Sequence, residues 1–386
     1  MKAGLIGWLC LMTTAAVWTA RADTIRLTDP AIFLSPYCWR TTAAGAALCP
    51  AGGGYLKFAV RGTTQLTLGV NTAINAGQPA LLMPSVKVIV SGPLRDGEAH
   101  YWQFPANNQA NTEITLASGL DPKLTYQVLL HAIGGDGRVM TAWSDLTVQT
   151  QLNHLSADAG AVFLPAPLRT KRALFLGASY EQAYFGNLRP DIPLHDFVDP
   201  SLAWPFFVAF GFDCEYGQIG IGSQGWVRFG NGGYPPFPQT WQHFDAGHPK
   251  TFGPDLDYVF VHLAENDAAQ DPGAVRRAVA AWIPQARATF GPRTRIFLIL
   301  SLPGIKSESV RSGAADAGDA RTYVLDPGSE YRRTVFAGGN TWAAPYDGLH
   351  LDAIHQSLFT AFVSRQAAAI LARDEAGPVE GSPTHP

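Results

Sequence analysis

Hydrophobic and polar residues alternate along the first part of the chain. Leu56, Phe58 and Val60 take every second position of one run, and similar runs cover residues 66–70, 86–90, 102–104, 114–116 and 124–130. Successive side chains of a strand point to opposite faces, so this period of two predicts short strands with one buried face. Turn sequences such as Asp96-Gly97 separate the runs. Residues 23–165 are therefore expected to form a β-sandwich of the jelly-roll type.

From about residue 170 the pattern changes to short, continuous apolar runs alternating with longer segments of helical spacing. The apolar runs cover residues 173–176, 216–221, 258–263 and 296–300, and the helical segments cover 201–210, 274–290 and 351–372. Continuous apolar runs are typical of parallel strands covered on both faces. Residues 170–372 are therefore expected to form a three-layer α/β/α sandwich with a parallel sheet, joined to the first domain near Pro165.

The two ends of the chain differ from both domains. Residues 1–22 combine a basic start at Lys2, an apolar stretch and the small-residue pattern Ala20-Arg21-Ala22, which predicts a cleaved secretory signal peptide. The apolar stretch is too short to favour a membrane span. Residues 375–386 are rich in Pro and Gly, and are expected to be a disordered tail.

Length, charge and cysteine content narrow the function classes. The chain has 386 residues, of which 47% are hydrophobic, enough for more than one core. Removing Lys2 and Arg21 from the 28 basic residues leaves 26 against 31 acidic ones, a net charge of −5 that gives no indication of nucleic-acid binding. Cys38 and Cys49 are expected to form a disulfide in an oxidising compartment, with Cys214 as a buried free thiol.

Three residue types needed for nucleophilic acyl transfer occur at predicted loops. Ser179 follows the first apolar run of the second domain, and Asp347 and His350 lie three residues apart before the last helix. In such a triad the imidazole accepts the serine proton, and the carboxylate orients the imidazole. Because catalytic groups lie beyond the carboxyl ends of parallel strands, these residues are expected to meet at one edge of the sheet.

Two further strand ends carry groups suited to an oxyanion hole. Gly222 follows the second run of the sheet and Asn266 follows the third. A backbone N–H at Gly222, an amide at Asn266 and the N–H of Ser179 itself would stabilise the oxygen of a tetrahedral intermediate. A register one residue later would place Ser223 in the position of Gly222.

These four blocks together resemble the SGNH, or GDSL-like, hydrolase superfamily. The resemblance covers residues 170–372 and implies Ser179 as nucleophile, Gly222 and Asn266 as oxyanion donors, and Asp347 with His350 as acid and base. With a jelly roll in front, the architecture is similar to carbohydrate esterase family 2 and related polysaccharide deacetylases. Two positions depart from the superfamily pattern, which usually has aspartate where Ala178 stands and glycine where Ala264 stands.

Simpler interpretations exist for the same residues. Ser179 alone would be a helix N-cap, and Asn266 alone a turn residue. Asp347, His350 and His355 would suit a metal, although the tight spacings of common zinc sites are absent, and His355 fits hydrogen bonding at the start of the last helix. Four aromatic residues near the blocks suit either a platform for sugar rings or core packing: Tyr180, Trp226, Tyr234 and Trp342.

The sequence thus predicts a secreted, periplasmic serine esterase that removes acetyl or other small acyl groups from a polysaccharide. It predicts no cofactor, no metal and no nucleic-acid partner. Two alternatives remain open. The first is a polysaccharide O-acyltransferase that uses the same site. The second is a non-catalytic protein that has lost the activity of this site and binds polysaccharide, or acts with exopolysaccharide assembly components.

Overall fold

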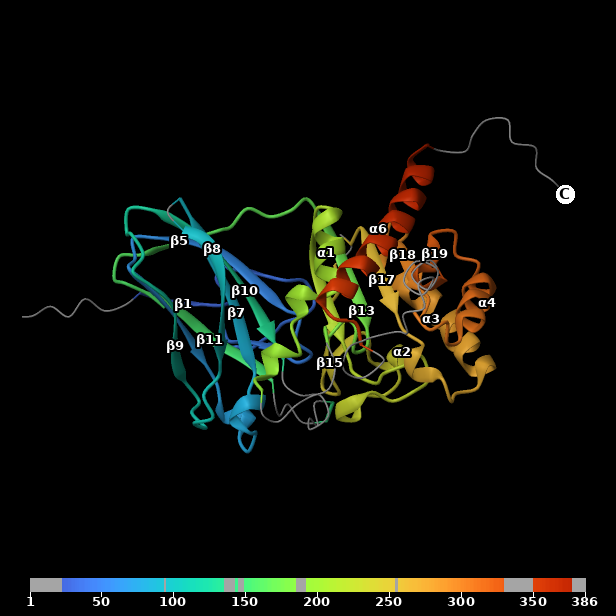
Figure 1. Cartoon of the computed structure of the whole chain (residues 1–386), viewed down its shortest axis with the longest axis horizontal. Helices are drawn as coiled ribbons and strands as arrows, with labels where there is room; N and C mark the ends of the chain where they lie inside the picture. Colours follow the sequence, from blue (N-terminus) through green and yellow to red (C-terminus); the bar gives the residue numbers. More distant parts are fainter. Residues whose placement is uncertain are drawn as a thin grey trace, which may run out of the picture.

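The computed structural model describes residues 23–93, 95–134, 143–144, 149–184, 192–253, 256–329 and 350–376. An all-β part and a mixed α/β part lie end to end along the longest axis (Figure 1). Residues 1–22, the expected signal peptide, lie outside the described residues. So do residues 377–386 of the expected tail, whereas Glu375 and Ala376 belong to the last helix, α6 (Ala353–Ala376).

The N-terminal part consists of two antiparallel sheets, which form the expected β-sandwich. The first has the order β3-β4-β11-β6-β9, with β1 beside β11. Its strands are β1 (Asp23–Arg26), β3 (Arg40–Thr41), β4 (Ala47–Cys49), β6 (Gln65–Val70), β9 (Thr112–Ser118) and β11 (Thr150–Ala157). The second has the order β12-β5-β10-β7-β8, with β2 beside β5. Its strands are β2 (Phe33–Leu34), β5 (Tyr55–Arg61), β7 (Ser85–Gly92), β8 (Arg95–Gln103), β10 (Thr125–Ile133) and β12 (Val162–Leu164).

The α/β part is built on five parallel strands in the order β14-β13-β17-β18-β19. These are β13 (Lys171–Gly177), β14 (Cys214–Gly220), β17 (Tyr258–His262), β18 (Arg295–Ile299) and β19 (Thr322–Leu325). Leu174 and Leu176 of β13 belong to one hydrophobic cluster, whereas Ala173 and Phe175 belong to another. The sheet is therefore buried on both faces, as its continuous apolar runs predict.

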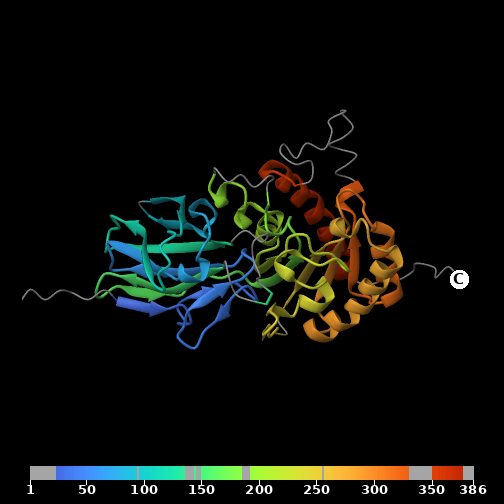
Figure 2. The ribbon, with the colours of Figure 1, turned by 90° about the horizontal axis from the view of Figure 1, so that it is seen from below.

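Helices cover both faces of this sheet (Figure 2). Residues of α3 and α4 pack in the cluster that contains Leu174, and residues of α1 and α6 pack with Phe175. Within the described residues, the other α-helices are α1 (Trp204–Gly211), α2 (Phe237–Thr240), α3 (Pro272–Phe290) and α4 (Ser307–Ala317). The remaining elements are the 3-10 helices η1 (Ala73–Asn75), η2 (Ala80–Leu82), η3 (Leu194–Asp196), η4 (Pro200–Leu202), η5 (Asn231–Gly233) and η6 (Glu265–Asp267), and a hairpin of β15 (His243–Asp245) and β16 (His248–Pro249).

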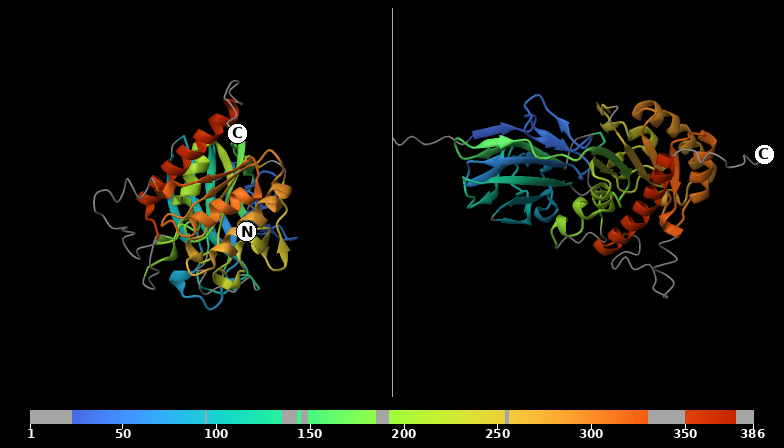
Figure 3. Two further views of the ribbon diagram at one scale, coloured as in Figure 1. Left: turned by 90° about the vertical axis from the view of Figure 1, so that its right-hand side faces the viewer. Right: turned by 90° about the horizontal axis from the view of Figure 1, so that it is seen from above.

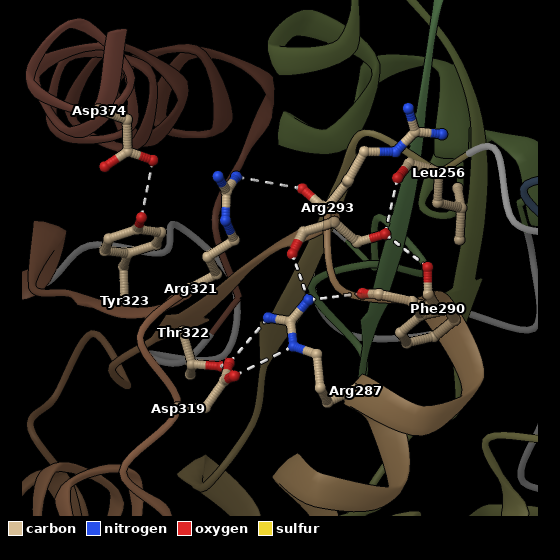
Figure 4. Close-up of polar contacts among 11 residues, drawn as sticks. Leu256, Arg287, Phe290, Arg293, Asp319, Arg321, Thr322, Tyr323 and Asp374 are labelled. Atoms are coloured by element: carbon tan, nitrogen blue, oxygen red, sulfur yellow. Dashed lines mark hydrogen bonds and ion pairs between the residues drawn. The ribbon is translucent and has the colours of Figure 1, made fainter. Parts of the chain in front are cut away.

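An arginine side chain links a helix to the sheet at the end where the parallel strands begin. Arg287, in the last turn of α3, pairs through Nε and Nη2 with both carboxylate oxygens of Asp319, just before β19 (Figure 4). Its Nη1 donates to the carbonyl oxygens of Gly291 and Thr294. This fork satisfies carbonyl groups beyond the helix end and fixes α3 to the strand beside it.

Ion pairs with buried carboxylates cross the seam between the two parts, which lie side by side in Figure 3. Lys57 of β5 lies 2.6 Å from Glu215 of β14, and Tyr55 donates its hydroxyl to the same carboxylate. Lys87 of β7 lies 3.2 Å from Asp199, which precedes η4. Such pairs are costly to break one partner at a time, so they fix how the sandwich and the α/β part sit together.

The cysteines differ from the expectation. Cys38 and Cys49 are free, buried thiols, so the structure corrects the predicted disulfide. The Cys38 thiol instead contacts the backbone of Gln218 across the seam, donating to its carbonyl oxygen at 3.4 Å and accepting from its N–H at 3.2 Å. Cys214 is a buried free thiol at the start of β14, as expected. No helix within the described ranges is long and apolar enough to cross a bilayer.

Candidate active site

Ser179 and His350 meet at the carboxyl edge of the parallel sheet. Ser179 lies two residues beyond the end of β13, and His350 lies three residues before α6. His350 Nε2 is 2.9 Å from Ser179 Oγ, the contact that a serine nucleophile and its base require. His350 is buried, whereas Ser179 is partly exposed, so the hydroxyl remains accessible beside a shielded imidazole. Asp347, the expected acid, lies outside the described residues, and its role stays a prediction.

Glu181 holds the turn that carries Ser179. One of its carboxylate oxygens accepts the backbone N–H of Ala178 at 2.7 Å. A Cβ on Gly177 would lie 1.9 Å from the same oxygen, so any side chain there would displace the Glu181 carboxylate. The carboxylate comes from within the turn, three residues after the position where the superfamily usually has an aspartate. Glu181 is not among the site residues expected from the sequence, because a lone glutamate after the serine carries no distinctive pattern.

The loop after β14 packs directly against the nucleophile turn. The N–H of Ile221 donates to Gly177 O at 3.1 Å, and a Cβ on Gly222 would come within 2.8 Å of the Gln182 side chain. Among the described residues, no acceptor takes the backbone N–H of Gly222 or Ser223. Both N–H groups therefore stay candidates for the oxyanion donor, and the choice between Gly222 and Ser223 stays open.

The loop after β17 joins the same edge. Asn266 donates its side-chain amide to Gln224 O at 3.1 Å, which places this expected oxyanion donor beside the loop of Gly222. Asp267 then accepts the N–H groups of Trp226, Val227 and Arg228 at 2.7–3.1 Å. Asp267 therefore has a structural role, because its carboxylate joins the two loops that carry the expected oxyanion donors.

Ala264 adopts a backbone conformation that L-amino acids rarely use. Its φ is 97° and its ψ is −17°, and its side chain is almost fully buried. Glycine is the usual residue for such a conformation, which matches the glycine that the superfamily has here. This strained residue lies two positions before Asn266. The loop that carries the expected oxyanion donor therefore has the backbone conformation typical of glycine, although an alanine occupies the position.

A buried histidine lies between two carboxylates behind this edge. His262, the last residue of β17, has Nδ1 2.9 Å from Glu181 and Nε2 2.8 Å from Glu265. Burial lowers the pKa of this imidazolium, but the charges of Glu265 and Glu181 outweigh burial and raise its pKa to about 10. His262 is therefore doubly protonated at neutral pH. A histidine inside a buried strand needs a partner, and that signal in the sequence was overlooked.

The aromatic residues proposed as a sugar platform are mostly core residues. Trp226 is 2% exposed and packs against Phe237 and Trp282, and Tyr234 is buried with its hydroxyl donating to Phe244 O. Packing is therefore the role that the structure shows for both residues, and their part in binding a sugar stays a prediction. Tyr180 is also buried, with its ring 5.9 Å from that of His350. Trp342 lies outside the described residues.

One further ring lies close to the candidate base. The ring of Tyr184, half-buried and absent from the sequence-based list, lies 4.8 Å from the imidazole of His350. His355 binds Asp352 through Nδ1 at 2.7 Å and through its backbone N–H at 2.8 Å, as expected for the start of the last helix. The part of the chain that the structure describes contains no group of three or more His, Cys, Asp or Glu side chains arranged to hold a metal ion.

Comparisons with known proteins identify the fold. No protein-family model matches the sequence, and no curated protein matches it. A family two carbohydrate esterase from Cellvibrio japonicus matches with a TM-score of 0.70 and 15% identity, over 91% of this chain and 98% of its own. The chain has the fold of an SGNH carbohydrate esterase.

Other structures with this fold carry different acyl chemistry. An acetyl xylan esterase from the rumen bacterium Butyrivibrio proteoclasticus matches with a TM-score of 0.70 and 12% identity, over 91% of this chain and 99% of its own. A salicylyl-acyltransferase from a tetracycline biosynthetic pathway matches with a TM-score of 0.60 and 13% identity, over 91% of this chain and 98% of its own. The SGNH carbohydrate esterase fold therefore does not distinguish an enzyme that hydrolyses an ester from one that transfers its acyl group, and an experiment has to do so.

Proposed function

We propose that the chain is a secreted, periplasmic serine esterase that removes acetyl or other small acyl groups from a polysaccharide. The single observation that carries the proposal is the 2.9 Å contact between His350 Nε2 and Ser179 Oγ at the carboxyl edge of the sheet. In this proposal an N-terminal jelly roll precedes an SGNH-type three-layer catalytic domain, and the boundaries are those expected from the sequence.

The proposed reaction proceeds through an acyl-enzyme. Ser179 Oγ attacks the ester carbonyl carbon while His350 Nε2 takes the hydroxyl proton. The N–H of Gly222 and the amide of Asn266 stabilise the oxyanion, and Asp347 holds His350 in the tautomer whose Nε2 is unprotonated and accepts the proton of Ser179. His350 then returns the proton to the departing sugar alcohol. Water attacks the acyl-enzyme in the second half, which releases the carboxylic acid and restores Ser179.

The proposal is tested by acetate release from p-nitrophenyl acetate and from acetylated xylan or cellulose. The mature protein should release acetate, and Ser179→Ala should lower kcat by at least about 10³-fold, because the covalent step is lost. Ser118→Ala, at an exposed serine at the end of β9, is the matched control and should leave the rate unchanged. Background release by the wild-type protein, equal to that of Ser179→Ala, would refute the hydrolase proposal.

The second candidate is a polysaccharide O-acyltransferase with the same nucleophile. It is favoured by the acyltransferase that shares this fold. In that case a sugar hydroxyl replaces water as the attacking group, so adding an oligosaccharide acceptor should move the acyl group to the acceptor rather than to water. A non-catalytic polysaccharide-binding protein would instead retain the oligosaccharide without labelling of Ser179 by a fluorophosphonate probe.

A further inference from the structure

Three ionisable side chains form a continuous buried array behind the candidate active site. Glu181 Oε1 is hydrogen-bonded to His262 Nδ1 at 2.9 Å, and Glu265 Oε1 lies 2.8 Å from His262 Nε2 as an ion pair without hydrogen-bond geometry. The side chains of Glu181 and His262 are fully buried, and that of Glu265 is nearly so. The indole N–H of Trp204 also donates to Glu181 Oε1 at 2.9 Å. Burying three ionisable groups is costly, so their mutual contacts must hold them together.

The two ends of the array belong to two different catalytic loops. Glu181 accepts the backbone N–H of Ala178, directly before Ser179. Glu265 directly precedes Asn266 and begins η6. His262 lies between them at the end of β17, which is the neighbour of β13 in the sheet. A single imidazole thus contacts both the turn that carries the nucleophile and the loop that carries an oxyanion donor.

We propose that His262 is a positioning residue that sets the separation of Ser179 and Asn266 by binding Glu181 on one side and Glu265 on the other. This inference rests on the proposed function, because it assigns the geometry of that same site. His262 touches neither the nucleophile nor the substrate in this proposal. It acts through the two carboxylates.

The positive charge of His262 explains why an uncharged residue could not hold the two carboxylates in the same way. With His262 protonated, each carboxyl group of the array faces a cation. The pKa of Glu265 is lowered because the contacts with His262 outweigh burial, and the pKa of Glu181 is raised because burial outweighs them. Without the cation, two buried carboxylates would face each other and repel. Their repulsion would displace both loops, or protonate one carboxylate and remove its hold on its loop.

The kinetic test compares His262→Gln with a control substitution at a buried ion-paired carboxylate elsewhere in the fold. Glu215→Gln is that control, since Glu215 is also fully buried and ion-paired, but lies near the start of β14, at the end of the strand away from Ser179. His262→Gln should lower kcat on p-nitrophenyl acetate by about 10-fold to 100-fold with KM changed less than about threefold, because a small misplacement of reacting groups affects the chemical step. Glu215→Gln should reduce stability but keep kcat.

A second measurement does not depend on activity. Amide hydrogen exchange followed by mass spectrometry reports the protection of residues 177–184 and 264–267 separately. His262→Gln should speed exchange in both segments, and Glu215→Gln in neither. If His262→Gln does not fold, Glu265→Gln takes its place, with faster exchange expected in the same two segments.

The outcomes separate this inference from the proposed function. Unchanged exchange in either segment, or a loss of kcat no larger than that of Glu215→Gln, would overturn the positioning role. An inactive wild-type protein whose two segments still respond together to His262→Gln would refute the esterase proposal and support the link between the loops.

Discussion

Replacing Ala264 by glycine should be far less harmful than the same change at an ordinary buried alanine. Ala264 combines a nearly complete burial with a φ of 97°, a region in which the Cβ of an L-residue is crowded by its own backbone. The substitution removes that crowding and keeps the path of the chain. Ala173 of β13 is the matched control, because it is equally buried and its φ is not positive.

The expected magnitudes follow from three contributions. Loss of a buried methyl group costs about 0.8 kcal/mol, and the added freedom of the unfolded chain costs a further 0.4–1 kcal/mol or so. Ala173→Gly should therefore lower the free energy of unfolding by about 1.5 kcal/mol. At position 264 the release of backbone strain returns about 1–2 kcal/mol. Ala264→Gly should consequently leave the free energy of unfolding within about 0.5 kcal/mol of the wild type.

Urea denaturation of the wild type and both variants measures this difference. The midpoints should separate while the slopes stay equal, which shows that stability rather than compactness has changed. A gap of about 1–2 kcal/mol between Ala264→Gly and Ala173→Gly is expected. Equal destabilisation by the two substitutions would refute the assignment of strain to Ala264.

Two further changes test other buried sites. His131 is buried in the seam, and burial lowers its pKa to about 4 despite the nearby charge of Asp199, so the unfolded chain takes up a proton first as pH falls below about 6.5. The free energy of unfolding should decline by up to about 3 kcal/mol between pH 6.5 and 4. Unfolding curves measured across this pH range should show a smaller decline for His131→Phe. An equal decline of the unfolding free energy in the two proteins would contradict this prediction. Gly177→Ala should abolish p-nitrophenyl acetate hydrolysis, because its Cβ would overlap the Glu181 carboxylate, whereas Gly211→Ala meets nothing within 4 Å and should be silent. Full activity of Gly177→Ala would show that the nucleophile turn tolerates displacement of Glu181.

The expected elements of the α/β part were predictable because hydrophobic periodicity reports burial directly. The apolar run at 173–176 lies within β13, and the helical segment at 274–290 lies within α3. α4 and β19 were missed. α4 has a small-residue, weakly apolar sequence in which Ser309 and Gly313 are among the buried positions, and β19 is only four residues long. Short or weakly apolar elements are specified by their neighbours rather than by their own pattern.

The candidate site was predictable only where one residue type implies one chemistry. Ser179 after β13 and His350 before α6 are the two residue types that a nucleophile and its base require, and the structure brings them together. Glu181 and His262 form a contact between residues 81 positions apart, which no local pattern reveals. Trp226 illustrates the opposite problem, because an aromatic residue near a site has the same local signature whether it binds a sugar or fills a core.

The ion pairs across the seam constrain how this protein can diversify. In many enzymes a binding module is attached by a linker, so recombination can replace it without cost to its neighbour. Here Glu215 of the α/β part needs Lys57 of the sandwich, and one continuous apolar cluster contains residues of both parts. An exchanged module would leave a carboxylate buried without its cation and an apolar surface uncovered. The sandwich and the α/β part are therefore expected to be inherited as a single unit.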